Sequence, residues 1–356
     1  MELEERVRRV ARHTAEVVTA EEVRALLERS ARPRAYIGLE PSGALTVAHL
    51  IPIRKVLDLA DAGCDVTVLL ADWHAWINDK LGGDLARIQA AGRYMEGVFT
   101  AFGAGAGRVG FRWAHDLVGS SEYWARVVRV AKATSLARTR RAMSIMGRGE
   151  EESNLDTSRL FYPAMQAADI FELGVDLAYG GTDQRRAHIL AREVAHHYGW
   201  PSPAAIHTPL LSSLKGGGRM DPIAGTSEAK MSKSDPTTGI AISAPRTEIA
   251  ARISGAFCPA KEVEGNPVVE AVRFVVLPWE GRLHVDRAEK HGGPLDFDSE
   301  EGFLAAWGAG KLHPQDLKSA VADALDRIVE PARRYFSAHP DLGPSSFGAS
   351  APDPVR

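Results

Sequence analysis

The first half of the chain alternates between short apolar runs and amphipathic stretches. Residues 35–41 and 67–72 are nearly continuous apolar runs, which are typical of strands buried on both faces of a sheet. Between these runs, apolar residues recur at helical spacing at Leu50, Ile53, Leu57 and Ala60. Gly63 then follows as a helix stop signal. A strand, a helix and a strand in this order predict a right-handed crossover and a parallel sheet.

The same pattern continues toward residue 200. The expected strands are 109–116 and 175–181, and the expected helices are 83–104, 160–174 and a segment from Thr182 or Asp183 to about His197. Residues 3–30 predict two earlier helices, and Thr19 with Glu22 forms a capping box at the start of the second. We therefore predict an α/β fold with a doubly wound parallel sheet.

A Gly-, Ser- and Pro-rich stretch separates this sheet domain from a smaller, mostly helix-forming second domain. The predicted divisions are N-terminal helices packed on the sheet domain at 1–34, the sheet domain at 35–211 with a helical connecting insertion near 117–158, a linker at 212–240, a helical domain at 241–336 and a tail at 337–356. Because the tail is rich in Pro, Gly and Ser, we expect it to be disordered.

Composition narrows the class of protein. The 356 residues carry a formal net charge of −3, which excludes a generally basic nucleic-acid coat but leaves room for a local basic patch. Cys64 and Cys258 are too few for a disulfide framework or a cysteine-based zinc site. Apolar runs stay below the ~18 residues that a membrane span needs, and the charged N-terminus lacks an apolar signal core. We expect a cytoplasmic protein with reduced thiols and no membrane association.

Two segments have the chemistry of phosphate-binding sites. The first strand ends in a Pro/Gly turn and leads into a helix, so backbone N–H groups converge near Thr46 and His49. The alternative interpretation is a helix cap with a surface histidine. The second segment, KMSKSDP (230–236), carries Lys230 and Lys233 in a polar loop. It is either a solvated linker or a loop that closes over the phosphates of a nucleotide.

Two further segments have the polar groups of a small-ligand site. Tyr162, Gln166 and Asp169 share one face of an otherwise apolar helix, where buried polar groups need partners. They form either a structural network or a site for a small polar ligand. GGTDQRR (180–186) joins a strand end to a helix, and strand ends are where ligands bind in doubly wound sheets. There Asp183 is suited to ribose hydroxyls and Gln184 to the polar end of a ligand.

Taken in order along the chain, these segments resemble class I tyrosyl-tRNA synthetases of the archaeal and eukaryotic type. The matching blocks are YIGLEPSG (36–43), FYPAMQAADI (161–170), YGGTDQRRAHILARE (179–193), KMSKS (230–234) and LHPQDLKSAVADALDRIVEP (312–331). The resemblance covers roughly residues 5–336. It implies a Rossmann-type catalytic domain followed by a small α-helical anticodon-binding domain.

The resemblance also implies an activity and its partners. L-Tyrosine and ATP would form tyrosyl-adenylate and pyrophosphate, with Mg²⁺ accompanying ATP. The tyrosyl group would then pass to the 3′ terminal adenosine of tRNA(Tyr). The protein would be a homodimer.

Site residues follow from the matching motifs. Tyr36 and Asp169 would hold the phenolic hydroxyl of the substrate. The residues for its ammonium and carboxylate would be Tyr162, Gln166 and Gln184. The residues in contact with ATP would be Gly38, Gly181, Asp183, Ser232 and Ser234, and the catalytic residues would be Thr46, His49, Lys230 and Lys233. The tRNA-binding residues would be Arg138, Arg140, Arg141, Arg185, His291, His313 and Asp316, although each of these arginines could instead lie on a solvated helix face.

Several features qualify this interpretation. Thr46 stands where the family signature has its first histidine, so it keeps a hydroxyl but lacks the imidazole. Trp73 and Trp76, just past the second strand, are either ordinary core residues or part of a reshaped tyrosine site. His196 and His197 lack partners at zinc spacing, so we expect no metal site. Two alternatives stay open: a paralogue that adenylates tyrosine or a modified tyrosine for another pathway, and an inactive tRNA-binding protein.

Overall fold

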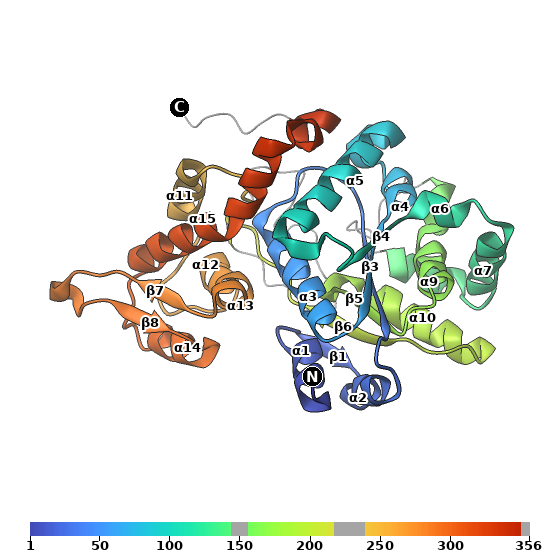
Figure 1. Ribbon diagram of the computed structural model, residues 1–356, viewed down its shortest axis with the longest axis horizontal. Helices are drawn as coiled ribbons and strands as arrows, with labels where there is room; N and C mark the ends of the chain where they lie inside the picture. Colours follow the sequence, from blue (N-terminus) through green and yellow to red (C-terminus); the bar gives the residue numbers. More distant parts are fainter. Residues whose placement is uncertain (144–155, 217–238, 350–356) are drawn as a thin grey trace. The chain divides into compact units, whose positions relative to one another are not determined.

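The computed structural model describes residues 1–143, 156–216 and 239–349 (Figure 1). These residues form two compact units. Within the described part, the first unit comprises 1–43 and 55–209, and the second comprises 44–54, 210–216 and 239–349. The division falls close to the predicted start of the linker at residue 212, but the short segment that carries Thr46 and His49 belongs to the second unit.

The first unit is built on a six-stranded sheet with the order β1-β6-β5-β2-β3-β4. The strands are β1 (Glu16–Val18), β2 (Arg34–Leu39), β3 (Asp65–Leu70), β4 (Gly110–Trp113), β5 (Leu177–Gly181) and β6 (Ala204–Thr208). Neighbouring strands from β6 to β4 are parallel, and β1 alone pairs antiparallel, with β6. In the centre, Ala35 of β2 lies opposite Val66 of β3 and Leu177 of β5. The predicted parallel α/β sheet is therefore confirmed.

The helices of this unit follow the predicted order. They are α1 (Leu3–Ala11), α2 (Ala20–Arg29), α4 (Asp72–Ile77), α5 (Leu85–Phe99), α6 (Ala114–Val118), α7 (Ser121–Lys132), α8 (Leu136–Ala142), α9 (Tyr162–Glu172) and α10 (Arg185–Tyr198), and α3 (Leu50–Asp61) begins in the short segment of the second unit. Short 3-10 turns precede four of them, at η1 (Val47–His49), η2 (Lys80–Gly83), η5 (Thr157–Leu160) and η6 (Thr182–Gln184). The capping box of Thr19 and Glu22 is present at α2.

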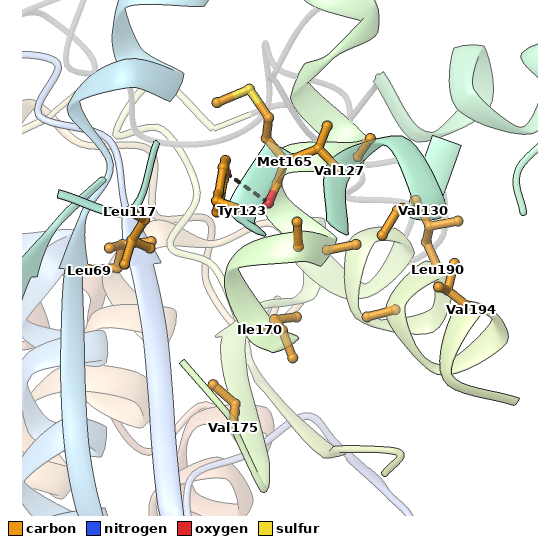
Figure 2. Packing of buried hydrophobic residues seen from close by; sticks show 14 of the residues in the cluster. Leu69, Leu117, Tyr123, Val127, Val130, Met165, Ile170, Val175, Leu190 and Val194 are labelled. Carbon is orange, nitrogen blue, oxygen red and sulfur yellow. Dashed lines mark hydrogen bonds between the residues drawn. The ribbon is translucent and has the colours of Figure 1, made fainter. Parts of the chain in front are cut away.

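A buried apolar cluster holds α9 in place beside the sheet. Figure 2 shows Val127 and Val130 of α7 facing Ile170 of α9, with Leu190 and Val194 of α10 on the same side. Apolar side chains on α9 are therefore covered by two helices, while its polar face is left for other contacts. This packing fixes the helix that carries the predicted tyrosine-binding residues.

The second unit contains mainly helices and one small hairpin. Its elements are α11 (Arg246–Gly255), α12 (Pro267–Ala271), α13 (Leu277–Glu280), β7 (Leu283–Val285), β8 (Leu295–Phe297), α14 (Glu300–Gly308) and α15 (Pro314–Ala338). The antiparallel pair β7–β8, like β1 and β6 in the first unit, was not predicted from the sequence.

The predicted disorder of residues 337–356 is wrong for the part that the structure describes. After α15, the chain forms η10 (Pro340–Leu342) and η11 (Pro344–Phe347), and the side chain of Phe347 is buried. One apolar anchor is enough to order a short Pro- and Gly-rich segment. Residues 350–356 lie outside the described residues. Among the helices described, none is both long and apolar enough to cross a membrane.

Candidate active site

The predicted tyrosine-binding residues gather where β2 meets the polar face of α9. Tyr36 lies on β2 and Asp169 on α9, and both side chains are buried. Burial and the negative charge of Asp169 both raise the pKa of Tyr36. The Tyr36 phenol therefore keeps its proton and remains a hydrogen-bond donor. A phenol donor and a carboxylate acceptor side by side can bind a hydroxyl that both donates and accepts.

Tyr36 has this position because Gly38 follows it on the same face of the strand. A Cβ atom at Gly38 would lie 2.5 Å from the hydroxyl oxygen of Tyr36. Real Cβ contacts are never this short, so any larger residue would displace the phenol. The sequence analysis assigned Gly38 to ATP, and the structure gives it this steric role as well.

The carboxylate of Asp169 has two partners that the sequence analysis did not single out. Tyr123 of α7 donates its hydroxyl to Oδ1 at 2.8 Å. The Nε2 atom of His74, on α4, lies 3.1 Å from Oδ2. His74 follows closely after β3, so its place near the carboxyl end of a central strand was a usable sequence signal.

A second polar group forms around Glu40, which directly follows β2. Tyr162 donates its hydroxyl to Oε1 of Glu40 at 2.5 Å, and the amide of Asn78 donates to both carboxylate oxygens at 3.2 and 3.3 Å. Lys80 approaches the same carboxylate at 3.7 Å. Because the ring of His74 packs edge-on against Tyr162, with centroids 5.0 Å apart, this group adjoins the Asp169 group.

The side chains of Gln166 and Gln184, which the sequence analysis assigned to the same end of the substrate, are in contact. The side-chain amide of Gln166 donates to Oε1 of Gln184 at 3.0 Å. Gln184 ends η6 at the carboxyl end of β5, where Gly181 and Asp183 also lie, half-buried. The structure therefore brings the amide pair to the strand end that the sequence analysis assigned to ribose and ligand binding.

Thr46 and His49 form a local unit of their own. The backbone N–H of Thr46 donates to Nδ1 of His49 at 3.1 Å, and Oγ1 of Thr46 lies 3.3 Å from the same nitrogen. Nδ1 of His49 also lies 3.2 Å from the backbone oxygen of Thr46, so three atoms of Thr46 surround this nitrogen.

Residues at the end of the predicted linker hold this segment in place. The N–H of Val47 donates to Ile240 at 2.9 Å, and Ile242 donates to Leu45 at 2.9 Å. Lys230, Ser232, Lys233 and Ser234 lie outside the described residues.

The predicted tRNA-binding residues differ in their surroundings. Arg138 donates to Glu193 at 3.1 and 3.2 Å, and Arg185 donates to both oxygens of Glu16 at 2.8 Å. These ion pairs reduce the net positive charge that either arginine offers. Arg140 and Arg141 are exposed on α8.

In the second unit, the three residues predicted to read the anticodon occupy a loop and a helix start. His291 is exposed on the 3-10 turn η9 (Glu289–His291), which lies between the strands of the hairpin. The side chain of His313 caps α15 by accepting from the N–H of Gln315 at 3.1 Å, and Asp316 lies in the first turn.

The described residues contain no group of three or more His, Cys, Asp or Glu side chains placed to hold a metal ion.

Trp73 and Trp76 pack edge-on, with ring centroids 5.6 Å apart, and Trp73 also contacts Trp124. Trp73 is partly buried, whereas the side chain of Trp76 is 43% exposed.

Comparisons with known proteins agree with the fold. The family model described as tRNA synthetases class I (W and Y) matches residues 28–330. The tyrosine–tRNA ligase of Aeropyrum pernix is 48% identical over 348 residues, covering 96% of each chain. That of Sulfurisphaera tokodaii is 45% identical over 342 residues, covering 95% of this chain and 94% of the relative. The solved tyrosyl-tRNA synthetase of Pyrococcus horikoshii, complexed with L-tyrosine, has a TM-score of 0.89 at 38% identity and covers 98% and 99% of the two chains.

The sheet, its strand-end site and the family match define a class I aminoacyl-tRNA synthetase. Within that class, the chain belongs to the tyrosyl-tRNA synthetases of the archaeal type, the tyrosine–tRNA ligases. The family and enzyme class predicted from the sequence motifs are therefore confirmed.

Proposed function

We propose that the polar face of α9 and the neighbouring end of β2 bind L-tyrosine, which the enzyme activates with ATP and then transfers to tRNA(Tyr). The observation that carries this proposal is the burial of Asp169 beside Tyr36. A buried carboxylate is costly unless it is given donors. The substrate hydroxyl would donate to Asp169 and accept from Tyr36.

The other end of the substrate is a zwitterion and needs groups of both kinds. Tyr162, Gln166 and Gln184 supply neutral donors and acceptors for its ammonium and carboxylate. Glu40, which accepts from Tyr162 at 2.5 Å, adds a negative charge beside the ammonium. Tyrosine would thus be held at both ends, which positions its carboxylate to attack the α-phosphate of ATP in line.

ATP would be bound by backbone groups and by side chains from several motifs. The residues in this role are Gly38, Gly181, Asp183, Ser232 and Ser234. Lys230, Lys233, Thr46 and His49 would stabilise charge that develops on the phosphates as pyrophosphate leaves. Mg²⁺ would enter as part of the nucleotide substrate.

The acceptor tRNA would contact both units. Arg140 and Arg141, which are exposed, and the ion-paired Arg138 and Arg185 would face its acceptor side. His291 would stack on an anticodon base, and His313 with Asp316 would read the first anticodon base.

We further propose a cytoplasmic homodimer. Exposed apolar side chains in the first unit support an interface of this kind, namely Trp76, Val128, Leu136 and Phe161. Sedimentation showing only monomers at micromolar concentration would contradict the dimer.

Tyrosine-dependent ATP–pyrophosphate exchange without tRNA tests the first step. We expect robust exchange with tyrosine and little with phenylalanine or tryptophan as controls. Absence of exchange with all three would refute the proposal and favour an inactive tRNA-binding protein.

A paralogue that serves another acceptor is the second candidate, and Thr46 in place of the signature histidine favours it. Charging of tRNA(Tyr) after successful exchange separates the two functions. Exchange without charging would indicate another acceptor.

A further inference from the structure

The Asp169 carboxylate has a partner on each oxygen, and each partner comes from a separate helix. Tyr123 on α7 donates to Oδ1 at 2.8 Å, and His74 on α4 lies 3.1 Å from Oδ2. All three side chains are at most 2% exposed. Three segments that are far apart in sequence therefore converge on one carboxylate without the help of bulk water.

Tyr123 can act only as a donor in this position. Burial and the charge of Asp169 both raise the pKa of Tyr123, so its phenol stays protonated. Its hydroxyl also lies 3.5 Å from the backbone oxygen of Met165, one turn before Asp169 on α9, and Figure 2 marks this contact. Because the ring is packed in the apolar cluster with Val127 and Val130, its hydroxyl has little freedom to turn away.

His74 is held just as firmly. Its ring packs edge-on against Tyr162, and neither ring nitrogen completes a hydrogen bond in the part of the chain that the structure describes, so Nε2 meets Oδ2 of Asp169 as a charge contact. The contact with Asp169 is thus its one polar contact there. Burial lowers the pKa of His74, but the carboxylates of Asp169, Glu40 and Asp72 raise it by more, so the net direction is upward.

We infer that Tyr123 and His74 are positioning residues that fix the Asp169 carboxylate as the acceptor for the substrate hydroxyl, and that they thereby set the selection of tyrosine over phenylalanine. The inference rests on the proposed function, in which Asp169 binds that hydroxyl. Because Tyr123 donates to Oδ1 and the His74 ring lies against Oδ2, rotation of the carboxylate is restricted and its remaining lone pairs keep a fixed direction. Tyrosine satisfies them, whereas phenylalanine leaves a buried charge without its last partner.

Tyr123→Phe tests the inference because it removes one oxygen atom and keeps the ring. In ATP–pyrophosphate exchange, we expect the KM for tyrosine to rise about tenfold, as for loss of a hydrogen bond to a charged group, while kcat changes less than about twofold. Exchange with phenylalanine should stay unchanged, so selectivity should fall about tenfold. General damage to the fold would reduce exchange with both substrates, so exchange with phenylalanine is the internal control.

Two further variants test His74 independently of Tyr123. His74→Leu should lower selectivity at least as much as Tyr123→Phe does, and His74→Gln should restore much of it because its amide can donate toward Oδ2. Tyr179→Phe is the matched control, since it also removes one buried hydroxyl, which lies 3.1 Å from Thr208. We expect it to leave selectivity unchanged. A selectivity ratio that is the same as wild type in Tyr123→Phe and His74→Leu would overturn the inference.

Asp169→Asn separates this inference from the proposed function. If Asp169→Asn abolishes selection but the Tyr123 and His74 variants do not, only the positioning role is wrong. If Asp169→Asn itself leaves selection intact, the assignment of the hydroxyl site fails and the positioning role fails with it.

Discussion

Acid should destabilise the first unit through a pair of buried histidines that the reaction does not use. The Nδ1 atom of His188, on α10, lies 3.0 Å from Nε2 of His207, on β6, and both residues are at most 1% exposed. Nδ1 of His207 lies 2.9 Å from the carboxylate of Glu16 on β1. A neutral pair fits this arrangement: Nδ1 of His188 donates to Nε2 of His207, and the Nδ1 proton of His207 faces the Glu16 carboxylate. A proton added to Nε2 of His207 would put two donors face to face, and one added to Nε2 of His188 would bury a charge.

The expected size of the effect follows from the pKa of His188. Burial, with a smaller effect of His207, lowers the pKa of His188 to about 3, from 6.5 in an unfolded chain. The pKa of His207 is also lowered by burial, although the charge of Glu16 acts in the opposite direction; Arg185 and Asp183 are the other charges that face it. Because the folded pKa is below the unfolded one, the contribution to stability is present above about pH 6.5 and is lost as the pH falls. At pH 5, His188 alone should cost about 2 kcal/mol of unfolding free energy.

The assay is urea unfolding at pH 7.5 and pH 5.0, for wild type and for His188→Gln. Between pH 7.5 and pH 5.0, the free energy of unfolding should fall by about 2 kcal/mol more in wild type than in the variant. The effects of carboxylates that both proteins share cancel in this difference. His197→Gln, an exposed histidine on the same helix, is the matched control and should lose as much as wild type. Equal acid losses in wild type and His188→Gln would refute the reasoning.

Three other changes probe single contacts. Gly38→Ala places a Cβ atom 2.5 Å from the hydroxyl of Tyr36, so the KM for tyrosine in exchange should rise at least about tenfold, whereas Gly255→Ala, with open space around it, should have no effect. Lys55→Met removes a buried ammonium that donates to the last turn of α1, and urea unfolding should show a loss of about 1–3 kcal/mol; no loss would contradict that role. Glu40→Gln should lower the affinity for tyrosine about tenfold in equilibrium binding. The affinity for 3-(4-hydroxyphenyl)propionate, which lacks the ammonium, should not change. Equal weakening of both ligands would argue against a charge contact.

The sequence predicted the polar face of α9 because helical spacing is a local property. Tyr162, Gln166 and Asp169 are three and four residues apart, so they share a face wherever the helix packs. The partners of Asp169 are of a different kind. Tyr123 lies 46 residues before it along the chain. Local periodicity carries no information on such a pair, and only the packing of α7 on α9 brings it together.

The missed strands have a similar explanation. β1 and the two strands of the hairpin have three residues each, too few to show an alternating pattern. β6 has five residues, all buried, but it begins with two alanines, which have weak strand propensity. β1 exists because the edge of β6 offers hydrogen bonds, and β6 is remote from it in sequence.

Charge in the sequence was an incomplete guide to charge on the surface. Arg138 and Arg185 were candidates for RNA contact because they lie in basic runs, yet each donates to a glutamate from another element. A run of arginines becomes a positive patch only where the fold leaves it without carboxylates. Arg140 and Arg141 are exposed on α8, and the ion pairs of Arg138 and Arg185 separate these two from their neighbours in a way that composition cannot.

The departure at Thr46 also has a structural consequence that the motif alone does not give. One contact of Thr46 with His49 runs through its backbone N–H, which any non-proline residue would supply. This part of the orientation of His49 is therefore independent of the side chain at residue 46. Threonine replaces the imidazole of the signature histidine with a hydroxyl. This hydroxyl lies 3.3 Å from Nδ1 of His49. Since both the fixed backbone donor and His49 remain, the substitution is expected to reduce phosphate stabilisation by one group and to leave the rest of the signature segment intact.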